Sequence, residues 1–417
     1  MKKIILNVGL LGVALVSIAQ VTPDKDPTGK TGSRIITTAV PFLSISPDAR
    51  AGGMADVGVA TSPDANSIYW NPAKLAFIQD DKTKKQLSMG GSLSYTPWLA
   101  KLIDDMALMN ISGYKRISKQ EVIGVSLYYF DLGDMIFRDG TGEVIGENRP
   151  REYSISGVYS RMLTENLSVG IGAKFINSNL AGNGTALSGG GVSKPGRTAA
   201  VDASVYYNKD LMIEGRKYNL ALGANISNIG AKVSYSSKDK QNFIPTNLRI
   251  GTAITTDIDL YNKVTLAIDV NKLLVPTPPT YKTNDDGTFV LDDNEELVIQ
   301  DGQDSDRGFI SGMFGSFSDA PNGGKEELQE VMIAAAVEYW YYNTVAARAG
   351  VFSENALKGN RKYLTFGLGL KYQSYGFDFA YLVPLRQNNP LQDTIRFSLS
   401  YNIASKTHVV ATESIEN

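Results

Sequence analysis

The feature that most constrains the fold of this chain is a two-residue alternation that recurs about fourteen times between residues 86 and 403. In each segment of roughly ten residues, large apolar side chains alternate with small or polar ones. The clearest examples are residues 123–129, 167–175 and 395–403. One such strand would also fit a soluble sandwich. A long series of segments, each matching the roughly 9–11 tilted residues that cross a bilayer, favours a transmembrane β-barrel.

The connections between the segments provide a second argument for a barrel. We expect strands near residues 87–96, 106–116, 121–131, 151–161, 167–177, 199–208, 218–228, 246–255, 263–272, 331–342, 345–353, 363–373, 376–383 and 394–403. The connections alternate between short ones, such as 343–344, and long ones, of which 274–330 is the longest. Short turns at one end and long loops at the other are typical of the periplasmic and extracellular ends of outer-membrane barrels. We therefore predict an all-β fold, a transmembrane antiparallel β-barrel of about 14 strands, with both termini in the periplasm.

The N-terminus is typical of a secretory signal peptide. Lys2 and Lys3 precede an apolar run over residues 4–16, and residues 17–19 read Ser-Ile-Ala, a small-x-small cleavage site. We expect residues 1–19 to be removed and the mature chain to start at Gln20. No later apolar run reaches the roughly 18 residues of a membrane-spanning helix, which excludes a helical membrane protein.

Composition limits the chemistry available to the chain. There is no cysteine, so no disulfide restrains the loops and no thiol can act as a nucleophile. The one histidine, His408, follows the last predicted strand in a polar tail, residues 404–417, which we expect in the periplasm. The net charge of −2 and the lack of a basic patch argue against nucleic-acid binding. We predict no enzyme activity, no cofactor and no catalytic metal.

If the apolar positions face lipid, the other positions line the lumen. The ionisable residues among them nearly balance in charge, which favours internal ion pairs over an ion-selective pore. They are Arg116, Lys174, Asp202, Arg249, Asp269, Glu338, Arg348, Lys371, Asp378 and Arg396. Many other lumen positions are glycine or alanine and leave room for a segment inside. The candidate is residues 20–85, which we predict to be an N-terminal hatch (plug) of short helices folded into the periplasmic mouth, ahead of a barrel over residues 86–403.

Two motifs in the hatch and one in the long loop resemble a known family. Residues 47–54 read PDARAGGM, residues 69–75 read YWNPAKL, and residues 308–321 read GFISGMFGSFSDAP. Asn-Pro-Ala at the end of a hatch is similar to the FadL-like transporters of fatty acids. The three strings together resemble the PorV family, outer-membrane barrels of the type IX secretion system. The residues that carry the hatch resemblance are Pro47, Asp48, Arg50, Trp70, Asn71, Pro72 and Ala73.

The resemblance implies a set of partners. Proteins of that family receive cargo by its C-terminal signal domain at a translocon barrel (SprA/Sov-like) and pass it to an attachment complex that contains the sortase-like PorU. Besides these proteins, membrane lipids are expected around the barrel.

The predicted extracellular loop 274–330 is a candidate contact surface, because loops of this length without a function are uncommon. Its apolar string, Phe309, Ile310, Met313, Phe314 and Phe317, either binds the translocon or cargo, or folds back over the barrel mouth or into the lipid interface. Its acidic stretch, residues 284–306, does not have the spacing of an EF-hand, so a solvated acidic loop is favoured over a calcium site.

Two functions remain open at this level. The resemblance implies a secretion component that recognises partners through its loops. The alternative is a FadL-like passive importer of hydrophobic small molecules, which needs an apolar path through the hatch. Apolar residues at inward positions of residues 331–342, including Met332, Ala334, Ala336 and Trp340, keep this alternative open.

Overall fold

The computed structural model describes residues 34–78, 88–99, 105–138, 142–180, 192–236, 241–285, 288–386 and 391–403. The predicted signal peptide, residues 1–19, the predicted tail, 404–417, and the two ends of the predicted hatch lie outside these ranges.

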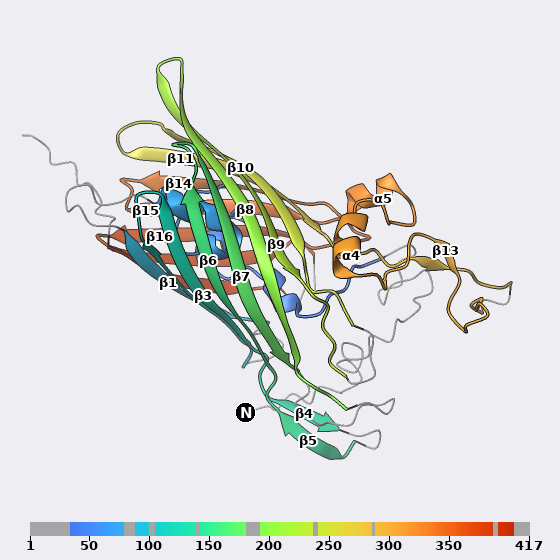
Figure 1. The fold of residues 1–417 in the computed structure, drawn as a ribbon. Helices are drawn as coiled ribbons and strands as arrows, with labels where there is room; N and C mark the ends of the chain where they lie inside the picture. The colour runs from blue at the N-terminus through green and yellow to red at the C-terminus, as the bar shows by residue number, and fades with distance from the viewer. Residues whose placement is uncertain are drawn as a thin grey trace, which may run out of the picture.

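Fourteen antiparallel strands form one closed barrel, in which β1 pairs with both β2 and β18 (Figure 1). The barrel strands are β1 (Met89–Pro97), β2 (Ala107–Arg116), β3 (Glu121–Asp131), β6 (Arg151–Met162), β7 (Leu167–Asn179), β8 (Gly196–Ile213), β9 (Arg216–Gly230), β10 (Asn247–Asp257), β11 (Asn262–Leu273), β14 (Met332–Tyr341), β15 (Val345–Ser353), β16 (Lys362–Tyr372), β17 (Tyr375–Pro384) and β18 (Ile395–Asn402). The barrel and the expected positions of all its strands are confirmed. In the described parts of the connections lie four shorter strands, β4 (Met135–Arg138), β5 (Val144–Asn148), β12 (Thr280–Tyr281) and β13 (Ile299–Asp301).

The hairpin of β8 and β9 is longer than predicted. Its two-residue turn places Glu214 and Gly215 at φ 49° and 77°, the left-handed conformation that tight hairpin turns require. The residues of this hairpin next to its turn are mostly polar, so they lack the alternation that identified the other strands.

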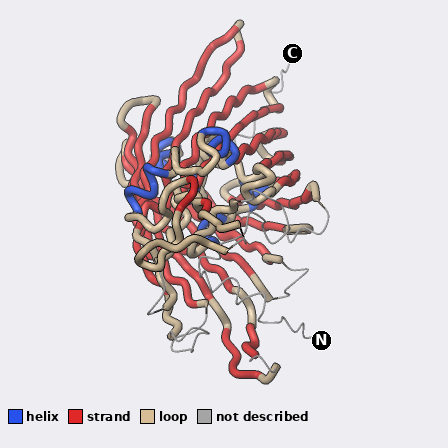
Figure 2. The backbone as a smooth tube through the Cα atoms, turned by 90° about the vertical axis from the view of Figure 1, so that its right-hand side faces the viewer, coloured by secondary structure: helices blue, strands red, loops and turns tan. Residues whose placement is uncertain are grey.

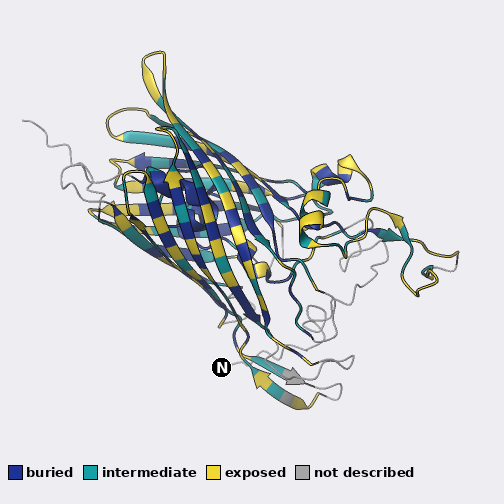
Figure 3. Cartoon of the chain, viewed as in Figure 1, coloured by how far each residue is buried: buried dark blue, intermediate teal, exposed yellow. Residues whose placement is uncertain are grey.

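Burial alternates along the strands as the sequence pattern predicts (Figure 3). On β2, Ile111 is 53% exposed whereas the next residue, Ser112, is 4% exposed. The outer face of the barrel is therefore apolar and the inner face is small and polar, which is the reverse of a soluble protein and suits a wall surrounded by lipid.

The connections divide the barrel into two ends. Short turns at 117–120, 163–166, 214–215, 258–261, 342–344 and 373–374 lie at one end, called here the short-turn end. The longer connections lie at the other, the long-loop end, where α4 (Phe309–Gly315) and α5 (Gly324–Gln329) belong to the β11–β14 connection. Figure 2 looks onto the long-loop end and shows loops and helices in front of the strands.

The described hatch, residues 34–78, lies inside the barrel, where Figure 1 shows it in blue. It contains η1 (Pro41–Ser44), α2 (Ala49–Gly52), α3 (Ser67–Trp70) and η2 (Pro72–Phe77). The Asp48 carboxylate caps α2 by accepting from the Ala51 N–H, and the Asn71 side chain caps η2 at Ala73, with Pro72 at its first position. No helix in the described ranges is long and apolar enough to span a bilayer.

The position of the hatch differs from the sequence prediction in one respect. We expected it at the short-turn (periplasmic) mouth, but the described hatch extends through the whole lumen. Arg34 contacts Leu357 at the long-loop end, and Ile78 lies beside Arg116 at the short-turn end. The difference arises because residues 34–40, which precede η1, lead toward the long-loop end, and their sequence gives no signal of direction.

Candidate functional site

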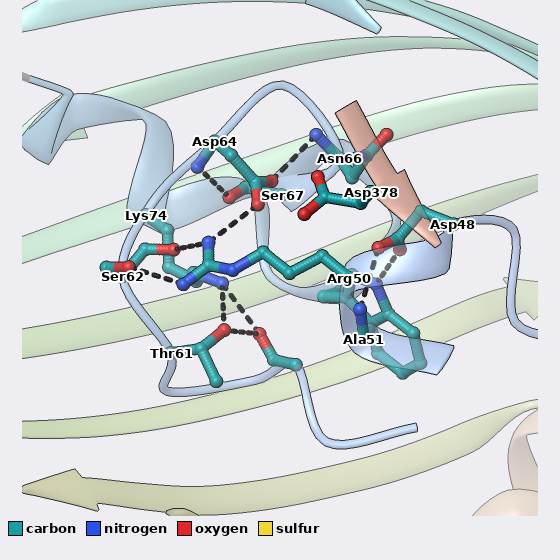
Figure 4. Close-up of polar contacts among 12 residues, drawn as sticks. Asp48, Arg50, Ala51, Thr61, Ser62, Asp64, Asn66, Ser67, Lys74 and Asp378 are labelled. Atoms are coloured by element: carbon teal, nitrogen blue, oxygen red, sulfur yellow. Dashed lines mark hydrogen bonds and ion pairs between the residues drawn. The ribbon is translucent and has the colours of Figure 1, made fainter. Parts of the chain in front are cut away.

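The first candidate site is the set of polar contacts that fixes the hatch in the lumen. Asp48 accepts hydrogen bonds from the Ala51 N–H (2.9 Å) and from Trp70 Nε1 (2.7 Å), which joins the two hatch motifs. Arg50 extends between Ser62 and Asp64, donating to the Asp64 carboxylate at 2.8 Å (Figure 4). These contacts lie within the hatch itself and hold its two motifs together.

Arg50 also joins the hatch to the barrel wall. Its guanidinium donates two hydrogen bonds to the Glu338 carboxylate of β14, at 3.0 and 2.9 Å. Glu338 in turn accepts from Arg348 (2.7 Å), and Arg348 donates to Asp378 (2.7 Å). Because these charges are buried together, removing one would leave its partner uncompensated in a dry interior.

The other lumen charges are also paired, as the balance of signs predicts. Lys174 pairs with Asp202 at 2.9 Å, and the Arg396 guanidinium reaches Asp56 of the hatch at 3.1 Å. Asp269 accepts the backbone N–H groups of Gly58 (2.8 Å) and Val59 (3.0 Å).

The three remaining lumen cations also have contacts. Arg249 lies 5.1 Å from the ring centre of Tyr69, and Lys371 lies 4.8 Å from that of Trp340. Arg116 donates to the carbonyl of Ala76 at 2.9 Å. The charged residues of the lumen therefore have partners, and several of these partners are groups of the hatch.

The Asn-Pro-Ala motif seats the hatch on strands β6 to β8. The Asn71 amide donates to the carbonyls of Val59 (3.1 Å) and Val205 (3.0 Å). The Ala73 carbonyl accepts from the hydroxyls of Ser160 (3.1 Å) and Ser168 (2.7 Å). The motif therefore has a structural role here: it satisfies backbone groups where the hatch meets the wall.

Glycines in the wall allow the hatch backbone to approach closely. A Cβ added at Gly170 would lie 2.5 Å from the Ala73 nitrogen, and one at Gly223 would lie 2.4 Å from the Val59 oxygen. At Gly350 it would lie 2.6 Å from Met54, and at Gly367 it would lie 3.0 Å from Gly53. The wall and hatch are in backbone contact on several sides, so little free space remains between them at these points.

The inward apolar residues of β14 also contact the hatch. Met332 and Ala334 belong to one buried cluster with Met54, Ala55 and Val57 of the hatch. The inward apolar residues were the reason to consider an importer. At these positions the space beside them is occupied by hatch side chains.

The second candidate site is the long loop with α4 and α5. Three carboxylates of α5 and its C-terminal end, Glu326, Glu327 and Glu330, form a buried cluster with three cations, Arg34, Lys272 and Lys358. Lys358 reaches Glu326 at 2.7 Å and Glu330 at 2.8 Å, and Lys272 reaches Glu327 at 3.0 Å. The cluster binds the loop to β11 and to the β15–β16 connection.

The hydrogen bonds of this cluster keep Glu326 ionised. Burial would raise the pKa of the Glu326 carboxyl, but hydrogen bonds from Arg34 and Lys358 outweigh it and lower the pKa from 4.5 to about 2. Sequence reasoning missed the cluster. Its one local signal is the spacing of Glu326, Glu327 and Glu330, which places them on one side of a helix.

The five predicted contact residues of α4 and its C-terminal end lie in different environments. Ile310, Phe314 and Phe317 are 56%, 68% and 49% exposed, which forms an apolar stripe at i, i+4 and i+7. Met313 is half-buried, and Gly312 packs against the ring of Phe243. Phe309 instead lies against the outer face of the barrel, where it lines an open depression of about 470 Å³ with Phe175, Val201 and Ile229.

The acidic stretch of the loop is largely solvated. Asp292 accepts the backbone N–H groups of Asn294 and Glu296, both at 2.9 Å, and so caps its own turn. Within the described ranges, no three His, Cys, Asp or Glu residues lie close enough together to hold a metal ion.

A closed ring of strands with an apolar outer face, a filled lumen and long loops at one end defines a plugged β-barrel of the outer membrane. A sequence model of one family, described as type IX secretion system protein PorV, matches residues 28–280, more than half of the 417 residues. The chain belongs to the PorV family.

Solved structures with a similar fold include other outer-membrane barrels. A Pseudomonas aeruginosa FadL homologue is 11% identical, with 89% of this chain and 99% of that chain covered and a TM-score of 0.43. The Ralstonia pickettii toluene transporter TbuX is 12% identical, with 87% and 98% covered and a TM-score of 0.44. At such identities the similarity concerns the fold and gives no support to a shared substrate. No curated protein sequence matches the chain.

Proposed function

We propose that this chain is a non-enzymatic component of the type IX secretion system that works by recognising proteins at its long-loop end. It binds cargo through the C-terminal signal domain at the translocon barrel and delivers it to the cell-surface attachment complex. Membership of the PorV family supports the secretion context. The exposed stripe of Ile310, Phe314 and Phe317 is the observation that carries the proposal, because apolar patches of this kind usually mark contacts.

The orientation proposed for the barrel follows the rule for this class, with short turns in the periplasm and long loops outside. Asn402, at the end of β18, then lies on the periplasmic side. Helices α4 and α5 face the cell exterior, where cargo and the attachment complex are found.

The importer alternative is disfavoured by the contacts of the hatch. An importer needs a path between hatch and wall, whereas Gly223 and Gly350 touch hatch backbone and Arg50 is tied to Glu338. A barrel that is filled by its own chain is better suited to recognition by its loops than to conduction through its lumen.

The test replaces Phe314 and Phe317 by Asp in the producing cell. Aromatic anchors of an interface typically contribute about 2 kcal/mol or more each. We therefore expect the variant to lose most of the co-purified translocon and to accumulate proteins with C-terminal signal domains in the periplasm. Leu291→Asp is the matched control, since Leu291 is 54% exposed elsewhere in the same loop. Normal secretion by the double variant would remove α4 from the proposed contact surface.

A further inference from the structure

The first described residues of the hatch, Arg34–Ser44, lie at the long-loop end and are called the strap below. The Arg34 N–H donates to the Leu357 carbonyl (3.1 Å), in the β15–β16 connection. The Ala39 N–H donates to the Phe243 carbonyl (2.8 Å), in the β9–β10 connection. Both connections belong to the long-loop end, so the strap touches that end on two sides.

The other end of the described hatch lies across the membrane from the strap. Arg116 donates to the carbonyls of Ala76 and Ile78 and also to that of Lys119, which lies in the short β2–β3 turn. The chain therefore enters the lumen at the long-loop end, crosses it, and leaves at the short-turn end, where β1 begins at Met89.

Charged contacts fix the outer end of the strap. The Arg34 guanidinium donates two hydrogen bonds to the Glu326 carboxylate of α5, at 2.9 and 2.7 Å. Glu326 is shared with Lys358 at 2.7 Å, so the strap, α5 and the β15–β16 connection meet at one carboxylate. All three side chains are at most 10% exposed. This bidentate geometry is specific to an arginine and a carboxylate held in register.

Apolar contacts fix the inner end of the strap. Val40, Phe42 and Leu43 are buried in one cluster with Leu108, Tyr128, Phe130 and Ile176 of the wall. Val40 has a φ of 47°, a left-handed conformation that a β-branched residue adopts only where its surroundings hold it. The strap is thus a packed part of the long-loop end.

We propose that the strap lies on the cell-surface side of the membrane, opposite Asn402, and not on the periplasmic side where both termini were expected. There it clamps α5 and the long loop to the barrel. The proposal rests on the orientation given under the proposed function.

The test is cysteine labelling of intact cells with a polyethylene glycol maleimide too large to cross the outer membrane. The chain has no cysteine, so each variant carries one reactive thiol. Thr37→Cys reports on the strap, because Thr37 is exposed and its neighbours contact the loops. Ser311→Cys in α4 and Gln120→Cys in the β2–β3 turn report on the two ends of the barrel, and both residues are exposed.

We expect Thr37→Cys and Ser311→Cys to be labelled on intact cells, and Gln120→Cys only after the membrane is permeabilised. Labelling of Thr37→Cys only together with Gln120→Cys would overturn the proposal, as would a strap cysteine that stays unlabelled in permeabilised cells. If Thr37→Cys follows Ser311→Cys but both need permeabilisation, the strap is placed correctly and the assumed orientation is wrong. Ile35→Cys, at a residue 43% exposed, repeats the test should Thr37→Cys fail to assemble.

Discussion

Glycines on the lumen side of several strands allow the backbone of the hatch to touch the barrel wall. Gly170, Gly223 and Gly350 each face hatch backbone at a distance that leaves no room for a Cβ. Asn71 and Ser168 then satisfy the polar backbone groups of the hatch at the same surface. The sequence shows these glycines as small lumen residues, but only the structure shows which of them meet the hatch.

A substitution at one of these glycines tests whether the hatch fills the lumen. We expect Gly223→Val to push Val59 away from the wall, costing about 1–3 kcal/mol in overpacking and opening a leak. The measurement is ion conductance of the purified protein in planar bilayers, which we expect to be low for the parent protein and raised in the variant. Gly157→Val is the control, because nothing lies within 4 Å of a Cβ at Gly157 and its side faces outward. Equal conductance of the two variants would contradict close seating of the hatch.

At the scale of elements, the strands were predictable because lipid imposes a period of two along every crossing segment. The part of the β8–β9 hairpin next to its turn was not predicted, because polar residues such as Lys209 and Asp210 lie beyond the alternating region. The apolar string of α4 was predicted as a group, but its division into exposed Phe314 and wall-facing Phe309 depends on how the loop folds back. The ion cluster of α5 was not predictable, because Arg34, Lys272 and Lys358 are far from Glu326 in sequence.

The docking of α5 is expected to depend on pH in a defined direction. The pKa of Glu326 is lowered from 4.5 to about 2, so its stabilising effect is present above pH 4.5 and is lost as the pH falls toward 2. Hydrogen exchange of α5 amides, corrected for intrinsic rates, measures this. We expect protection of α5 to decline below about pH 4, as Glu326 takes up a proton.

Glu326→Gln separates this effect from general acid unfolding. The variant lacks the ionised group, so we expect weaker protection of α5 at pH 7 and a flatter pH dependence. Lys325→Ala, a change at the exposed neighbouring residue, is expected to behave like the parent protein. A parent-like profile for Glu326→Gln would mean that the cluster does not hold α5.

At the scale of the whole molecule, the barrel is filled by its own N-terminal segment, and in the proposed function recognition takes place at the long-loop end. The ion pairs between Arg50 and Glu338 and between Arg396 and Asp56 connect the hatch to strands far apart in sequence. The central claim is therefore that the protein works without moving its hatch.

Locking the hatch to the wall by a disulfide tests this claim most directly. Ala49 and Ser398 are chosen for the cysteine pair because they are in contact across the hatch–wall boundary, where the Ala49 N–H donates to the Ser398 hydroxyl at 2.9 Å, and because the chain has no cysteine of its own. Formation of the disulfide is checked first on the purified protein. The measurement is the amount of cargo on the cell surface for Ala49→Cys with Ser398→Cys, oxidised and reduced, beside the two single variants. We predict equal surface cargo in all four cases, whereas a loss on oxidation that reduction restores would contradict the account.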